Sequence, residues 1–235
     1  MAVRPVFVAS TLPGSYVIER SVSFQWHPGM AKSQSQKSID SLHSAARMQF
    51  DLQRILEISS KSRDELGVCA SAFNLQIKTV RNAREFSVES AYQASKVFEN
   101  GGPYADLLDV GSREARADPR LRSSGRLIAF QFYGDRWKLL PRRAFYDWLY
   151  VQALSKQPEI ANKIVEYQAF TDIAFNPEKS INCQAHAAAL YVSLFRKGLV
   201  DEVLDDTSMF LRAFAGERER EAVVGDEIQR GMKFD

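Results

Sequence analysis

The hydrophobic pattern of this 235-residue chain changes from a strand-like to a helical period within its N-terminal third, and this change constrains the fold most. Residues 4–11 and 16–26 are rich in Val, Ile, Phe and Tyr, as strands are, and Leu12-Pro13-Gly14 between them is typical of a turn. Residues 27–38 are rich in Ser, Gln and Lys and indicate an exposed loop. We therefore expect an N-terminal β arm followed by a loop.

Helical spacing begins at Ser38, after which apolar residues recur every three or four positions as far as Phe50. The elements expected beyond this helix are strands at 55–60 and 72–80, a helix from the N-cap Ser87 to about Asn100, a charged exposed segment at 111–126, a strand at 126–134, a helix opened by Pro141 at 141–156, a shorter helix at 158–169 and a long helix at 178–197. We expect a mainly helical α+β fold with short strands in one domain, 1–235. Its parts are an N-terminal β arm and loop (1–37), a core (38–200) and a C-terminal surface segment (201–235).

Composition excludes several classes of protein. The chain is 45% hydrophobic and 26% charged, as soluble globular proteins are, and no run approaches the roughly 18 apolar residues of a membrane span. The first fifteen residues lack a long apolar stretch, so we expect a cytoplasmic protein with no membrane partner. The net charge of +2 neither requires nor excludes a nucleic acid.

Metal and cofactor chemistry is not expected from the sequence. The two cysteines, Cys69 and Cys183, form no paired motif, and the three histidines lie far apart. The chain has no phosphate-binding glycine loop and no nucleophile elbow.

The segment 86–104 carries the most suggestive chemistry. If it is helical, Glu89, Gln93 and Lys96 lie at i, i+4 and i+7 and share one face. Such a pair of charges is usually a solvated surface feature, worth about 0.2–0.5 kcal/mol. Pattern alone therefore favours the structural interpretation.

The same region resembles the NADAR family. The residues that carry this resemblance are Ser71, Phe73, Asn74, Glu89, Tyr92, Gln93, Ala94 and Lys96. Residues 112–121 and Arg136-Trp137-Lys138 are similar to two further elements of the family. Ser90 stands where the family usually has His, and the segment FNPEKSINCQ replaces the closing Asp-x-x-Trp-Gly element of the riboflavin-pathway relatives.

The chain also resembles a narrower NADAR branch, the antitoxins encoded with DarT-type ADP-ribosyltransferase toxins. Four segments carry this likeness: 55–62, 89–108, 130–150 and 169–191. The resemblance implies a NADAR fold and hydrolysis of a C–N glycosidic bond. The substrate would be ADP-ribose attached to the guanine amino group of DNA, and the products free ADP-ribose and intact guanine. Single-stranded DNA is favoured, because a guanine inside a duplex must first be extruded.

The resemblance gives Glu89 and Lys96 catalytic roles. A buried lysine has a lowered pKa and becomes a nucleophilic amine, so Lys96 is suited to attack the anomeric carbon and form a Schiff base. Glu89 is suited to protonate the leaving amine or the ring oxygen and later to activate water, and an apolar wall such as Tyr92 or Phe73 would raise its pKa.

Other residues are candidates for binding the substrate. The neutral amides of Asn74 and Gln93 suit sugar hydroxyls, and the rings of Trp137 and Tyr133 suit stacking on a base. Arg136, with Lys138, suits the pyrophosphate. The remaining candidates are Lys61, which follows the predicted strand at 55–60, and Asp172, Asn176 and Asn182, which lie in the altered third motif.

Two other functions remain open. An antitoxin can silence its toxin by binding it without catalysis, and the aromatic and charged C-terminal half offers a surface for this. A hydrolase of the same family can also act on a small ribosylated metabolite, and the modest net charge is compatible with that substrate.

Overall fold

A four-stranded mixed sheet forms one side of the protein. The structure is a computed structural model that describes residues 1–79, 83–177, 180 and 182–213. The sheet has the order β2-β1-β9-β3, in which β3 and β9 are parallel and the other pairs are antiparallel. Its strands are β1 (Ala2–Ala9), β2 (Val17–Phe24), β3 (Ile55–Glu57) and β9 (Ala169–Thr171). The expected N-terminal hairpin is therefore present, but it is half of this sheet and not a separate arm.

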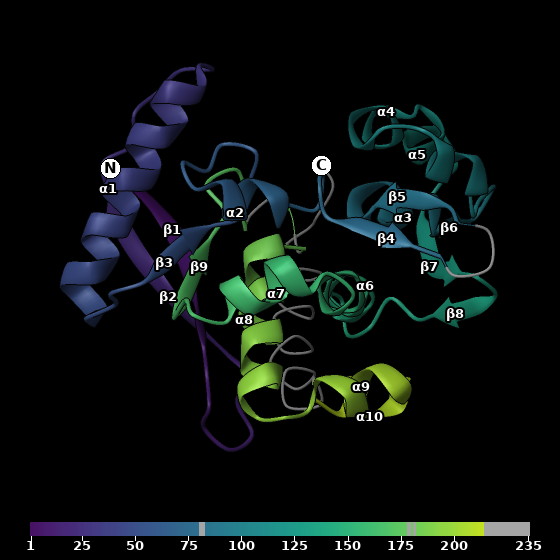
Figure 1. Ribbon diagram of the computed structural model, residues 1–235. Coiled ribbons are helices and arrows are strands. Elements are labelled where there is room, and N and C mark those ends of the chain that lie inside the picture. Colours follow the sequence, from purple (N-terminus) through teal and green to yellow (C-terminus); the bar gives the residue numbers. More distant parts are fainter. Residues whose placement is uncertain (80–82, 178–179, 181, 214–235) are drawn as a thin grey trace, which may run out of the picture.

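Alternating side chains of these strands build two hydrophobic clusters. Val6, Ile55 and Ala169 point to the face that α1 (Lys32–Phe50) covers. The next residue in each strand points the other way, towards α8 (Gln184–Arg196) and the main core. Figure 1 shows this arrangement, with α1 on one side of the sheet and α8 on the other. Both faces are buried, which explains why the first two residues of β3 and of β9 are apolar.

The first helix begins at Lys32, so the prediction of a loop at 27–38 is wrong for its second half. The residues of this first turn and a half face solvent, and an exposed helical face can be as polar as a loop. Ser38 is fully buried, and its hydroxyl accepts a hydrogen bond from the backbone N–H of His27. This contact fixes where the chain enters the helix.

The central helix α3 (Val88–Ala94) is shorter than predicted. Ser87 caps it as expected, because its hydroxyl accepts a hydrogen bond from the backbone N–H of Ser90. The helix does not continue to Asn100, since Lys96 already belongs to β6 (Lys96–Phe98) and pairs with β7 (Leu127–Phe132). Strand pairing with a distant segment therefore ends the helix. The expected single helical face for Glu89, Gln93 and Lys96 does not exist.

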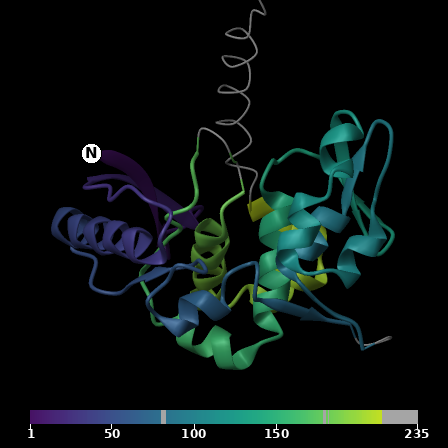
Figure 2. The same ribbon diagram turned by 90° about the horizontal axis from the view of Figure 1, so that it is seen from above.

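The remaining described elements complete an α+β fold with more helix than strand. They are α2 (Glu65–Cys69), β4 (Gln76–Lys78), β5 (Glu85–Ser87), η1 (Ala105–Asp109), α4 (Ser112–Ala117), α5 (Arg120–Ser123), β8 (Asp135–Trp137), α6 (Ala144–Ser155), α7 (Pro158–Ile164), α9 (Val200–Asp205) and α10 (Thr207–Ala213). Figures 1 and 2 show α6 and α8 near the centre, between the large sheet and the part that holds α3, α4 and the small sheets.

Several expected boundaries need correction. The strand predicted at 72–80 is only β4, because residues 71–75 form a turn in which Ser71 O accepts the N–H groups of Asn74 and Leu75. The charged segment 111–126 contains the two short helices α4 and α5. The helix predicted at 141–156 begins only at Ala144, after a turn closed by Pro141 O, and that predicted at 158–169 ends at Ile164.

The C-terminal end of the described chain packs on the core. The long helix predicted at 178–197 is described as a helix from Gln184. Of the expected surface segment 201–235, α9 and α10 bury Val203 and Phe210, and residues 214–235 lie outside the described part. No helix that the structure describes combines the length and apolar character of a membrane span.

Candidate active site

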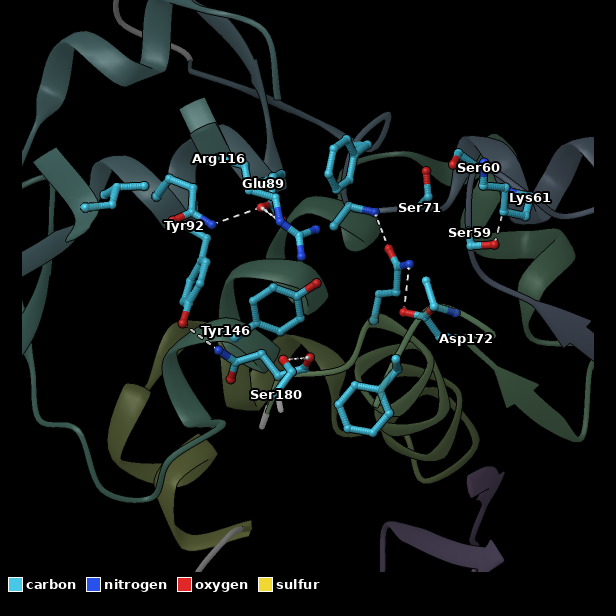
Figure 3. Close-up of a pocket in the computed structure, with 18 of the residues that line it drawn as sticks. Ser59, Ser60, Lys61, Ser71, Glu89, Tyr92, Arg116, Tyr146, Asp172 and Ser180 are labelled. Carbon is cyan, nitrogen blue, oxygen red and sulfur yellow. Dashed lines mark hydrogen bonds and ion pairs between the residues drawn. The ribbon is translucent and has the colours of Figure 1, made fainter. Parts of the chain in front are cut away.

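A cavity of about 540 Å³ opens where the carboxyl ends of β3 and β9 meet α3, α4 and the start of α8. This volume lies in the range of sites that hold a nucleotide-sized ligand. Its walls are formed by Ser59, Ser60, Lys61, Ser71, Ala72, Phe73, Glu89, Tyr92, Gln93, Lys96, Arg116, Leu121, Arg122, Tyr146, Asp172, Ala174, Phe175, Ser180, Asn182 and Gln184. Figure 3 shows Glu89, Tyr92 and Arg116 at one end, and Ser59, Ser60, Lys61 and Asp172 at the other.

Glu89 and Gln93 form a buried pair on α3. Both residues are only 6% exposed, and Gln93 Nε2 donates a hydrogen bond of 2.9 Å to Glu89 Oε1. Arg116 Nε, from α4, lies 3.9 Å from the same oxygen. Gln93 Oε1 is buried and has no hydrogen-bond partner among the described residues. A buried carbonyl without a partner is rare, and a ligand N–H or O–H group would satisfy it.

Lys96 reaches the same end of the cavity from β6. Its Nζ lies 4.8 Å from the centre of the Tyr92 ring. Burial lowers the pKa of this amine from 10.5 to about 8; Glu89 opposes the shift and Arg116 adds to it. At pH 7.5 the neutral share therefore rises from about one in a thousand to about a quarter. A neutral amine is the form that can act as a nucleophile.

Tyr92 and Asn182 close the floor of this end. The Asn182 side chain donates a hydrogen bond to the Tyr92 hydroxyl. Burial and the nearby Glu89 raise the pKa of Tyr92, so it is a neutral phenol near pH 7. Asn182 Oδ1 is buried without a partner among the residues that the structure describes, as Gln93 Oε1 is. Two amide oxygens are thus available for ligand donors.

The opposite end of the cavity is formed by the turns that follow β3 and β9. Asp172 Oδ2 accepts a hydrogen bond from Gln184 Nε2, whose Oε1 accepts one from the backbone N–H of Ala72. Burial and the charge of Glu57 raise the pKa of Asp172 to about 7. This end therefore combines hydroxyl groups, the Lys61 ammonium group and a carboxyl group that titrates near neutral pH.

The fold brings six of the eleven predicted site residues to the cavity. These are Lys61, Glu89, Gln93, Lys96, Asp172 and Asn182. They come from five separate segments, so the helical spacing that first drew attention to three of them is not what unites them.

The other five lie elsewhere. Trp137 is in the core, where its ring centre is 5.0 Å from that of Trp148, and Asn74 donates to Val68 O and Ser71 Oγ beside the cavity. Tyr133 is exposed in the turn between β7 and β8, and Arg136 is exposed in β8. Asn176 follows the cavity residue Phe175 but does not line the cavity.

Several residues of the cavity were missed at the sequence level. Arg116 lies in the segment 112–121 and Arg122 directly follows it. This segment resembles the family, but the resemblance did not mark either arginine as a site residue. Ser59 and Ser60 directly precede Lys61, and Tyr146 and Gln184 lie in the segments 130–150 and 169–191 that carry the family likeness, which did not single them out. In the described part of the chain, no three His, Cys, Asp or Glu side chains come together as a metal site would need.

Fold and site together define a class of protein. It is an α+β protein whose polar cavity places a lysine of lowered pKa near a buried carboxylate, as enzymes of nucleophilic and acid–base chemistry do. The sequence pattern of the family described as DarT1-associated NADAR antitoxin matches residues 2–223, almost the whole chain. The chain therefore belongs to this antitoxin family. A comparison with curated proteins finds no match.

Proposed function

We propose that this antitoxin is a hydrolase that removes ADP-ribose from the guanine amino group of modified DNA and so reverses the action of a DarT-type toxin. The observation that carries the proposal is the meeting of Lys96 and Glu89 in one cavity, with the pKa of Lys96 lowered to about 8. Hydrolysis of an N-glycosidic bond needs a nucleophile for the anomeric carbon and an acid for the leaving nitrogen. Lys96 and Glu89 supply these two groups.

The reactive form of the pair holds one proton, which Lys96 has passed to Glu89. The neutral Lys96 amine attacks the anomeric carbon, and the bond from this carbon to the guanine amino nitrogen breaks. The electron pair stays with the guanine nitrogen, which takes the proton of Glu89. Intact guanine leaves at this step.

The second half of the reaction releases the sugar. Opening of the ribose ring moves one proton from the lysine nitrogen to the ring oxygen and leaves a protonated imine on Lys96. Water adds to the imine carbon while Glu89 takes up the proton that the water loses. Departure of Lys96 as a neutral amine yields free ADP-ribose, so one water is consumed and both side chains are regenerated.

The polar lining of the cavity supports a nucleotide sugar as the substrate. Gln93 Oε1 and Asn182 Oδ1 offer acceptors for sugar hydroxyls close to the reacting groups. Arg116, Arg122 and Lys61 bring three cations to the walls, where a diphosphate needs them.

The test is release of ADP-ribose from a single-stranded oligonucleotide ADP-ribosylated at guanine, in the presence of a chelator. Wild-type protein should release it, Lys96→Ala and Glu89→Gln should reduce the rate by at least about 100-fold, and Lys78→Ala should not. Lys78 is a suitable control because its ammonium group pairs with Glu85 on an exposed hairpin. Cyanoborohydride added during turnover should attach ADP-ribose to Lys96.

Each other result points to a different function. A fully active Lys96→Ala protein would remove the Schiff base but keep the hydrolase. Wild-type protein that binds the toxin yet never releases ADP-ribose would be a non-enzymatic antitoxin. Turnover of a free ADP-ribosylated nucleotide, but not of the oligonucleotide, would make a small ribosylated metabolite the substrate.

A further inference from the structure

A buried carboxylate lies directly behind the cavity. Glu57 is the last residue of β3 and is only 2% exposed. Its side chain accepts three hydrogen bonds: from Ser59 Oγ at 2.7 Å, from Thr171 Oγ1 at 2.6 Å and from the backbone N–H of Ile173 at 2.9 Å. Burying a carboxyl group costs free energy that a hydrophobic side chain would not cost, and these three donors offset part of it.

Two of these donors flank Asp172. Glu57 accepts hydrogen bonds from Thr171 and Ile173. These two contacts fix the backbone on both sides of Asp172, whose side chain lies on the wall of the cavity. Asp172 is held further by Gln184 Nε2 at Oδ2 and by the backbone N–H of Ala174 at Oδ1. Glu57 therefore orients a cavity residue without lining the cavity itself.

The two carboxyl groups compete for one negative charge. Burial raises the pKa of Glu57, but its three donors favour the charged form, so Glu57 ionises before Asp172. Burial and the Glu57 charge then raise the pKa of Asp172 to about 7. Like charges in a buried site cannot both form easily, so Asp172 keeps its proton below about pH 7.

The other titratable groups around this pair are neutral near pH 7. Tyr146 and Tyr150 on α6 and Cys183 before α8 all have raised pKa values because they are buried. His43 on α1 contacts Thr171, and burial lowers its pKa to about 4. Lys61 is the charged group that shares this end of the cavity.

We propose that Glu57 is a positioning residue that acts through Asp172: it aims the Asp172 carboxyl group into the cavity and favours its protonated form, so that Asp172 donates a hydrogen bond to a phosphate oxygen of the ligand. This rests on the proposed function, which supplies a diphosphate. Ser60 and Lys61 give the same end of the cavity two further side-chain donors. A charged Asp172 would repel a diphosphate that these groups attract.

Glu57→Gln tests the charge and spares the hydrogen bonds. Its Oε1 can accept from Ser59 and Ile173 as before, and its Nε2 can donate to Thr171 Oγ1. Thr171 then donates its own hydroxyl proton to His43 Nε2, which lies 2.8 Å away, and His43 shifts its proton to the other ring nitrogen. The variant should therefore fold. If Glu57 served only to pack the fold, Glu57→Gln would bind ligand with the same affinity and the same pH profile as wild-type protein.

The readout is the pH dependence of ADP-ribose binding, measured by calorimetry, since the diphosphate of ADP-ribose does not titrate near neutral pH. Binding to wild-type protein should weaken about tenfold between pH 6 and 8, as Asp172 loses its proton. In Glu57→Gln this fall should move to lower pH by about one unit, which weakens binding about fivefold at pH 7. Asp172→Asn, a permanent neutral donor, should lose this tenfold fall and keep only the smaller one that Lys96 causes as it loses its charge near pH 8.

A second measurement separates failure of this inference from failure of the proposed function. The Asp172 carboxyl carbon can be titrated by NMR without any ligand. A midpoint that does not change between wild-type protein and Glu57→Gln overturns the inference, whatever the protein hydrolyses. Affinity that rises with pH overturns it as well. If the Asp172 midpoint does shift in Glu57→Gln but wild-type protein binds no ADP-ribose, the phosphate contact is refuted, whereas failure to release ADP-ribose from the modified oligonucleotide refutes the proposed function.

Discussion

Lys96 Nζ lies 4.8 Å from the centre of the Tyr92 ring, in the wall of a cavity that also holds Glu89. The ring face attracts the ammonium form, as does the Glu89 carboxylate. Burial outweighs both, because it lowers the pKa of the amine to about 8. The lysine therefore changes its charge close to physiological pH.

The rate should follow this titration. The reaction needs one proton on the Lys96–Glu89 pair, and the pair loses this proton as the pH rises through the pKa of Lys96, so kcat/KM for release of ADP-ribose should fall above about pH 8. The positive charge of Arg116 lowers the pKa of Lys96, so Arg116→Gln should move the midpoint to higher pH. The shift should be a few tenths of a unit, because the Arg116 side chain is 65% exposed and screened by solvent. Arg122→Gln is the matched control, and an equal shift there would contradict the assignment.

Lys96 should also reduce the stability of the fold. Below about pH 8 the folded protein buries an ammonium group that the unfolded chain leaves in water, so Lys96→Met should raise the free energy of unfolding at pH 7 by about 1–2 kcal/mol. Between pH 8 and 10.5 the unfolded chain holds the proton more tightly, wild-type stability rises, and the advantage of the variant disappears. Urea unfolding at pH 7 and 10.5 measures this, with Lys78→Met as the exposed control. Loss of stability in Lys96→Met at pH 7 would show that the amine is not desolvated.

Gly67 should tolerate no side chain. A Cβ there would overlap the Glu57 carbonyl oxygen and lie 2.6 Å from Ser62 Oγ, so α2 would have to move away from β3. Gly67→Ala should lower the free energy of unfolding by at least about 2 kcal/mol, although alanine favours helices. Gly111→Ala, where a Cβ meets open space, should lower it by less than about 1 kcal/mol. Equal urea midpoints for the two variants would contradict this packing.

Local patterns in the sequence were sufficient for some features and not for others. The hairpin at residues 2–24 and the Ser87 cap follow from residue types at short range, and the structure has both. The family motif drew attention to Glu89, Gln93 and Lys96, which do line one cavity. The helical geometry assumed for them was wrong, because the pairing of Lys96 with Phe130 in β7 overrides the local helical pattern.

The other half of the site depends on contacts that are distant in sequence. β9 lies between β1 and β3, which brings Asp172 beside the Ser59–Lys61 turn. No periodicity in the segment 169–172 indicates this pairing, since two apolar residues fit a buried strand or the end of a helix equally well. Glu57 follows two apolar residues, and a serine two positions later, its one local partner among the described residues, is too common a pattern to mark it. Its role emerges only when Thr171 and Ile173 are beside it.

Trp137 and Tyr133 are both aromatic, but one packs in the core and the other is exposed. Both were candidates for stacking on a base, but Trp137 is 6% exposed against Trp148 and Phe145, whereas Tyr133 is 60% exposed at a turn. Trp137→Ala should lower the free energy of unfolding by about 3–5 kcal/mol, because it leaves a cavity in the aromatic core. The folded fraction should bind ADP-ribose as wild-type protein does. Tyr133→Ala should change stability by less than about 0.5 kcal/mol. Urea unfolding measures the stability of both variants, and calorimetry measures their binding of ADP-ribose. Weaker ADP-ribose binding by folded Trp137→Ala would show that Trp137 contributes to the binding site.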